Sequence, residues 1–79
     1  MDAIVVVESF FGLSLEINLD KETIKIKKDN ILQRMYTKTT SEIMDVLKQL
    51  HTDKGENKKA ICGWVIADLL DGEKLAMNN

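Results

Sequence analysis

The sequence predicts a small α+β domain, with an antiparallel sheet of three strands, or possibly four, packed against two C-terminal amphipathic helices. Three observations predict it: a β-branched run at residues 3–7, an apolar/polar alternation over residues 13–28, and a helical spacing of apolar residues beyond residue 39. The chain of 79 residues has room for one core, so residues 1–79 are taken as a single domain.

The first strand is predicted from the run Ala-Ile-Val-Val-Val at residues 3–7, because β-branched side chains favour a pleated strand. An unbroken apolar run is typical of a strand buried on both faces. Two short helices would cover such a strand thinly, so a second copy or another protein is expected to cover part of one face. Val5 and Val7 are therefore candidate partner-binding residues.

Two adjacent aromatic residues, Phe10 and Phe11, precede Gly12, where the chain is expected to turn. Neighbouring residues cannot share one face of a strand, so at least one ring is a candidate for exposure and partner binding.

The following hairpin is the clearest pattern in the chain. Its apolar positions are odd-numbered in the first strand and even-numbered in the second, so facing residue numbers must sum to an odd value. One register places Ile17 opposite Ile24 and Glu16 opposite Lys25, and the next places Glu16 opposite Lys27. Both registers pair opposite charges, and a shift by one residue would bury the lysines.

Residues 29–36 allow two interpretations. A short helix capped by Asp29 or Asn30 is favoured, because four apolar or aromatic residues recur at helical spacing: Ile31, Leu32, Met35 and Tyr36. A fourth strand is the alternative.

The first long helix is predicted from a capping box, Thr39 with Glu42 three residues on. One side of this helix is apolar, with Ile43, Val46, Leu47 and Leu50 and with Met44 at its margin. We expect the helix to end near residues 51–54 with Gly55 as terminator, and His51 to be a half-buried structural residue.

The second helix is predicted from Lys58 or Ala60 to Asp71. Its broad apolar face comprises Ile61, Cys62, Val65, Ile66, Leu69 and Leu70. Trp64 falls on the opposite face with Asp68 and Asp71, where it is a candidate binding residue. The alternative makes residues 61–70 a buried strand, with Asp71 and Gly72 turning into a last strand.

Catalytic chemistry is hard to assemble from this composition. The single histidine and single cysteine exclude a Cys/His zinc cage and an intrachain disulfide, and Cys62 is expected to face the core, where a thiol is inert. Asp68 and Asp71 lack a third ligand for a divalent ion. We therefore expect no enzyme activity, no metal and no cofactor.

Charge is unevenly distributed. Residues 1–20 hold four acids and no base, whereas residues 21–38 hold six bases and two acids, a local excess of +4. The basic segment suggests an alternative function, nucleic-acid binding, through Lys25, Lys27, Lys28 and Arg34. Glu16 opposes a lysine in either register, and stacking aromatic residues are lacking in these strands, so this function is the weaker hypothesis.

The leading hypothesis is a non-enzymatic protein-interaction module that acts stoichiometrically as an inhibitor, adaptor or regulator of another protein, or as a homodimer. Its predicted partner-binding residues are Val5, Val7, Phe10, Phe11, Trp64, Asp68 and Asp71. The chain has neither a signal-peptide pattern nor an apolar run of membrane-spanning length, so we expect a cytoplasmic protein without membrane contact. Its lysine-rich, arginine-poor composition is typical of phage and mobile-element proteins, whose site of action would be the host cytoplasm.

Overall fold

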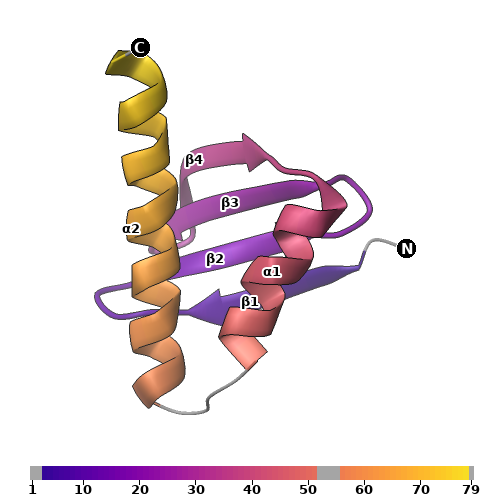
Figure 1. The fold of residues 1–79 in the computed structure, drawn as a ribbon. Coiled ribbons are helices and arrows are strands. Elements are labelled where there is room, and N and C mark those ends of the chain that lie inside the picture. The colour runs from indigo at the N-terminus through magenta and orange to yellow at the C-terminus, as the bar shows by residue number, and fades with distance from the viewer. Residues whose placement is uncertain (1–2, 52–55, 79) are drawn as a thin grey trace.

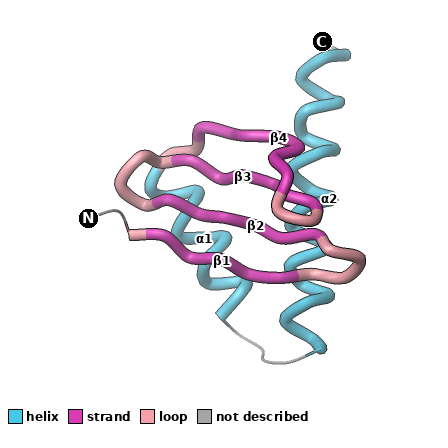
Figure 2. Tube along the Cα trace, turned by 180° about the vertical axis from the view of Figure 1, so that it is seen from behind, coloured by secondary structure: helices cyan, strands magenta, loops and turns pink. Residues whose placement is uncertain are grey.

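Two helices cover one face of a four-stranded sheet, and the other face is left open (Figures 1 and 2). The computed structural model describes residues 3–51 and 56–78, with side chains described for 57–73 in the second segment. In chain order the elements are β1 (Ile4–Glu8), β2 (Leu13–Asn18), β3 (Thr23–Lys28), β4 (Ile31–Thr37), α1 (Thr40–His51) and α2 (Glu56–Asn78). The predicted α+β class, with its sheet and two C-terminal helices, is confirmed.

The sheet is an antiparallel meander in the order β1-β2-β3-β4, so every strand pairs with its neighbour in sequence. Ile17 lies opposite Ile24 and Glu16 opposite Lys25, which confirms the first of the two predicted registers. The alternative register, with Glu16 directly opposite Lys27, is wrong.

The core lies between the sheet and the helices. From the sheet it takes Val7, Leu15, Ile17, Ile24 and Ile26, and from the helices Ile43, Leu50, Cys62, Val65 and Ile66. These side chains are at most 6% exposed. The odd positions of β2 and the even positions of β3 thus face the helices, as the alternation predicts.

The expectation that the first strand is buried on both faces is wrong for the single chain. Val7 is buried and Val5 is half-buried against the core, but Ile4 and Val6 are 49% and 59% exposed. The physical reason is position: β1 is an end strand, and both helices lie on the same face of the sheet (Figure 1).

The preference for a short helix at residues 29–36 is also wrong, because the segment forms β4. Asp29 and Asn30 both adopt positive φ, 50° and 67°, and form a two-residue turn between the paired residues Lys28 and Ile31. Asp and Asn tolerate this left-handed conformation, which two-residue hairpins require. The hairpin therefore overrides the helical spacing of the apolar residues that follow.

The second helix is longer than predicted and runs to Asn78, so the alternative of a buried strand turning at Asp71 and Gly72 is wrong. The added length attaches α2 to β4. Tyr36 Oη donates a hydrogen bond to Glu73 Oε2 at 2.9 Å, and Arg34 Nε lies 3.6 Å from the same carboxylate oxygen. Burial, and then the contact with Glu73, raises the pKa of the Tyr36 hydroxyl.

The capping box at the start of α1 is confirmed. Glu42 N–H donates to Thr39 Oγ1 at 3.2 Å, and Thr39 N–H donates back to Glu42 Oε1 at 3.1 Å. The backbone hydrogen bond from Thr39, followed by the one from its hydroxyl, lowers the pKa of Glu42. The predicted end of this helix beyond His51, including Gly55, lies outside the described residues.

A first prediction follows for the cap. Replacing Thr39 with Ala removes an N-cap oxygen and should lower the free energy of unfolding by about 1 kcal/mol. The pKa of Glu42 should rise part of the way to its ordinary value. Because folding lowers this pKa, the contribution of the ionised carboxylate is present above the unfolded-state pKa and is lost as the pH falls through the folded-state value.

The difference between T39A and the unaltered protein, measured by urea denaturation, should therefore be larger at about pH 7 than below about pH 4. The matched control is T39S, which keeps the hydroxyl. If T39S is as unstable as T39A, the hydroxyl does not cap the helix.

Candidate protein-binding surface

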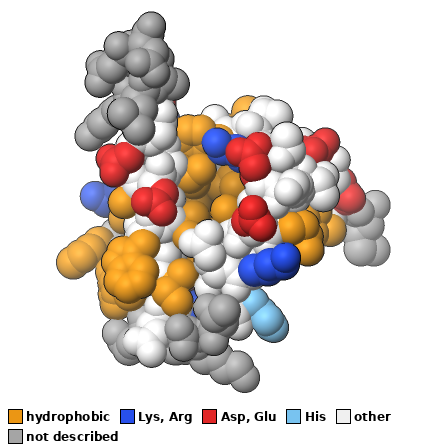
Figure 3. Space-filling model, in the orientation of Figure 1, with side chains coloured by type: hydrophobic (Ala, Val, Ile, Leu, Met, Phe, Trp, Pro, Cys, Tyr) orange, Lys and Arg blue, Asp and Glu red, His pale blue; other side chains and the backbone are white. Residues whose placement is uncertain are grey.

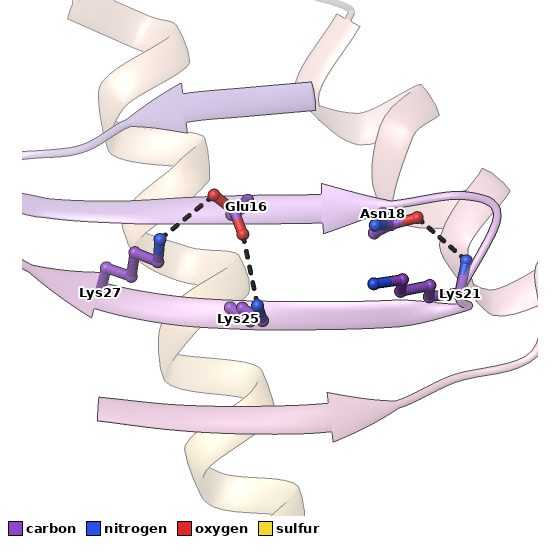
Figure 4. A network of polar contacts seen from close by, with 5 residues as sticks. All are labelled: Glu16, Asn18, Lys21, Lys25 and Lys27. Atoms are coloured by element: carbon purple, nitrogen blue, oxygen red, sulfur yellow. Dashed lines mark hydrogen bonds and ion pairs between the residues drawn. The ribbon is translucent and has the colours of Figure 1, made fainter. Parts of the chain in front are cut away.

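Basic residues of the sheet are largely paired with acids. On the open face, Glu16 lies 3.2 Å from Lys27 Nζ and 3.7 Å from Lys25 Nζ (Figure 4). Arg34 lies opposite buried Ile26, on the helix-covered face, and pairs with Glu73. Lys28 is exposed at the end of β3. The four residues of the nucleic-acid hypothesis thus do not converge on one uncompensated basic patch.

The same close-up shows how the neighbouring turn is held. Asn18 is only 8% exposed, and its Oδ1 accepts a hydrogen bond from Lys21 N–H at 2.9 Å (Figure 4). This polar side chain therefore serves the β2–β3 turn.

The β1–β2 turn presents an aromatic residue in an unusual backbone conformation. Phe11 and Gly12 have φ values of 61° and 78° and lie between Phe10 and Leu13, whose N–H donates to the Phe10 carbonyl at 3.2 Å. Turns of this kind favour Asn and Gly, because a bulky side chain at positive φ is strained. The Phe11 side chain gains little burial in return, since it is 89% exposed. Strain of this kind motivates a hypothesis of function.

The turn is fixed against α2 and against the next hairpin. Ser9 Oγ donates to the Lys59 carbonyl at 2.9 Å, and Lys59 Nζ lies 5.8 Å from the centre of the Phe10 ring. Gly12 C=O accepts a hydrogen bond from Asp29 N–H at 2.9 Å, and a Cβ on Gly12 would collide with the Asp29 carboxylate. Phe10, 38% exposed, therefore lies in a defined place beside α2.

Trp64 is the largest exposed apolar side chain of α2, with 67% of its surface accessible. Figure 3 shows apolar side chains gathered on the lower half of this helix. A hollow of about 380 Å³ lies beside the indole, between α1 and α2, and is lined by Lys48, Gln49, Ile61 and Trp64. Asp68 and Asp71, both exposed, continue along α2. The prediction that Trp64 faces away from the core is confirmed.

The predicted partner-binding residues thus divide into two groups. Phe10, Phe11, Trp64, Asp68 and Asp71 are exposed, but Val7 is buried and Val5 is half-buried against the core. The exposed apolar side chains of β1 are instead Ile4 and Val6, which the sequence analysis did not single out. The sequence could have indicated this. Side chains alternate between the two faces of a strand, so Ile4 and Val6 share a face with Glu8, whose charge is typical of the exposed face.

Nucleophilic chemistry finds no support at the cysteine. Cys62 is fully buried, its thiol donates to the Val7 carbonyl at 3.5 Å, and burial raises the pKa of the thiol to about 11. His51 is exposed, which corrects the expectation of a half-buried residue. Among residues 3–51 and 57–73, whose side chains the structure describes, no group of His, Cys, Asp and Glu is arranged to hold a metal ion.

No helix in the described part of the chain combines the length and the apolar character needed to cross a membrane. The chain matches no known family model, no curated protein and no solved structure.

A second prediction concerns the strained turn. Replacing Phe11 with Asn should raise the free energy of unfolding by about 1 kcal/mol, because Asn adopts positive φ more readily and little burial is lost. Thermal and urea denaturation measure this change. F11A is the matched control: it removes the same ring but keeps the strain, so its stability should remain near that of the unaltered protein. Equal stabilisation by F11A would show that the exposed ring, rather than the backbone, is responsible.

Proposed function

We propose that this chain is a non-enzymatic protein-interaction module that binds a partner protein stoichiometrically. The observation that carries the proposal is the exposure of Trp64, 67%, on the rigid second helix. Exposing an indole to water is unfavourable, and tryptophan is among the residues that most often dominate binding energy at interfaces.

The surroundings of Trp64 support a protein partner. Ile61 and the hollow between the helices offer an apolar depression beside the indole, and Phe10 lies on the flank of α2 held by Lys59. Asp68 and Asp71 supply an acidic rim. An apolar centre with a polar rim is the usual anatomy of a protein interface, so the partner is expected to present an apolar side chain bordered by basic residues.

In its more specific form, the proposal describes a cytoplasmic inhibitor, adaptor or regulator. In one version, the chain is encoded by a phage or mobile element and acts on a host protein. This version rests on the lysine-rich, arginine-poor composition. A buried, protonated Cys62 supports binding rather than thiol chemistry. Pairing of two copies is a further form of the same proposal.

The third prediction tests the surface around Trp64. Replacing Trp64 with Ser should lower affinity for the partner by roughly 30-fold, the factor for a hot spot of about 2 kcal/mol, with little loss of fold stability. The measurement is capture from lysate of the native cell by the immobilised chain, followed by titration of the captured protein. Trp64 is the only tryptophan, so its fluorescence reports the same event directly.

The matched control is M35S, which removes an apolar side chain of similar exposure, 56%, from β4. Capture should be kept by M35S and lost by W64S, and the fluorescence of the unaltered protein should shift to shorter wavelength on binding. Equal capture by W64S and the unaltered protein would remove Trp64 from the interface and end the proposal in this form.

Nucleic-acid binding is the second candidate. The observation that favours it is that Lys28, at the end of β3, is exposed and follows two other lysines of the same strand. Under this function, DNA or RNA would bind at low salt, more weakly as the salt concentration rises, and more weakly still to the K25Q/K27Q double variant. The fourth prediction is the opposite result: because both lysines are paired with Glu16, we expect no binding in a filter or gel-shift assay. Salt-dependent binding that the double variant reduces would reverse the order of the two candidates.

A further inference from the structure

The outer edge of β1 carries backbone groups that the sheet does not use. Leu19 N–H donates to Ala3 C=O at 3.0 Å, and Ser9 N–H donates to Leu13 C=O at 2.8 Å. In an antiparallel pair the N–H and C=O of one residue point to the same side, and the side alternates along the strand. The odd-numbered residues therefore bond to β2, and Ile4, Val6 and Glu8 direct their N–H and C=O groups outward.

This edge has few of the features that usually block edge pairing, and Glu8 at its end is the one charged residue of β1. β1 contains neither Lys nor Pro, and its pairing with β2 runs without a register shift. At the opposite edge of the sheet, by contrast, the β3–β4 pairing shifts register between Ile26 and Lys27, and Arg34 lies in β4. The edge of β1 is thus the one better prepared to accept another strand.

The helix layer reaches beyond this edge of the sheet. In both views the C-terminal end of α1 lies beyond β1, outside the edge of the sheet (Figures 1 and 2). A hollow of about 390 Å³ on α1 is lined by Met44, Leu47, Lys48 and His51. Val46 and Gln49 line a different hollow together with residues of α2, so the Met44 hollow lies on the flank of α1 that faces away from α2.

The charges near β1 indicate which kind of peptide segment would bind at this edge. Glu8 is exposed at one end of β1, where it lines a polar hollow of about 290 Å³ together with Asp29. Asp20 lies at the other end, where its carboxylate accepts the Ala3 N–H at 2.7 Å. Glu8 makes no ion pair within the part of the chain that the structure describes. Both ends of the β1 edge therefore carry a carboxylate, whereas Lys48 and His51 border the Met44 hollow on α1.

We propose that β1 binds an extended segment of a partner protein as a fifth strand, and that this segment is apolar at alternate positions with Lys or Arg at its ends. Its backbone would bond to Ile4, Val6 and Glu8. One set of its side chains would rest against the Met44 hollow, and the other would lie beside Ile4 and Val6 on the open face. A single segment fits better than a second copy, because α1 of each copy extends past its own β1 and would meet the helices of the other.

The proposal relies on the proposed function only in taking a protein as partner. It uses the edge of β1 instead of Trp64, and the Met44 hollow and the hollow beside Trp64 share only Lys48. The probe is the capped peptide acetyl-Lys-Val-Thr-Val-Thr-Val-Lys-amide. In the free protein, hydrogen exchange followed by NMR should be fast at the amides of Ile4, Val6 and Glu8 and slow at those of Val5 and Val7. On peptide binding, the three even-numbered amides should become protected by at least about tenfold.

Two matched pairs of controls test the direction of bonding and the charge. Methylating the two threonine nitrogens blocks one edge of the peptide and methylating the three valine nitrogens blocks the other, so only one of these peptides should bind. Replacing the terminal lysines of the peptide with glutamates should weaken binding by about fivefold, the factor for a cross-strand pair of ~1 kcal/mol. In E8K, where Asp20 still favours a lysine at the other end, the preference between the lysine and glutamate peptides should disappear.

The outcomes separate this inference from the proposed function. W64S should bind the peptide normally; if peptide binding fails while Trp64-dependent capture persists, the edge proposal alone is overturned. Equal binding of both methylated peptides, or protection of the even-numbered amides in the dilute free protein, also overturns it. Protection that grows with protein concentration and accompanies a doubled mass would make a second copy the occupant and overturn the peptide proposal.

Discussion

Leu15 and Ile17 of β2, with Ile24 and Ile26 of β3, form the aliphatic layer that joins the sheet to the helices, and they are at most 2% exposed. Leu15 lies opposite Ile26 and Ile17 opposite Ile24, so the register of this hairpin decides which face of the whole sheet the helices cover. A change of one residue in that register would turn Lys25 and Lys27 inward while Leu15 and Ile17 stayed in the core. Every other surface of the molecule takes its position from this constraint.

The consequence is a strongly two-sided sheet. Both helices occupy the aliphatic face, which leaves Glu16 and its two lysines on the open face and puts the exposed Ile4 and Val6 beside them. On the helix layer, the requirement that Cys62, Val65 and Ile66 face inward places Trp64 outward. The exposed apolar residues are therefore direct products of the same packing that forms the core.

Sequence reasoning limited the hairpin to two registers, of which one is observed, and reached the capping box and the outward orientation of Trp64 on α2, because each depends on local periodicity. It failed at residues 29–36, where the spacing of Ile31, Leu32 and Met35 suits a helix. There the turn at Asp29 and Asn30 decided the outcome through pairing with β3, which periodicity does not reveal. It also misassigned Val5 and Val7, because the number of faces a strand buries depends on where it lies in the sheet. The unpaired edge of β1 depends on the direction of backbone groups, which the pattern of side chains does not reveal.

The order of elements along the chain also has a consequence for biosynthesis. The strands pair only with their sequence neighbours, so the meander can form from local contacts as soon as Thr37 has left the ribosome. At that moment neither helix has been completed, and the aliphatic side of the sheet faces water. The nascent chain must stay in this state until Cys62, Val65 and Ile66 emerge to cover it. The nascent chain is thus most prone to aggregate between the synthesis of the fourth strand and that of the second helix. During this interval a chaperone could bind the exposed aliphatic face of the sheet.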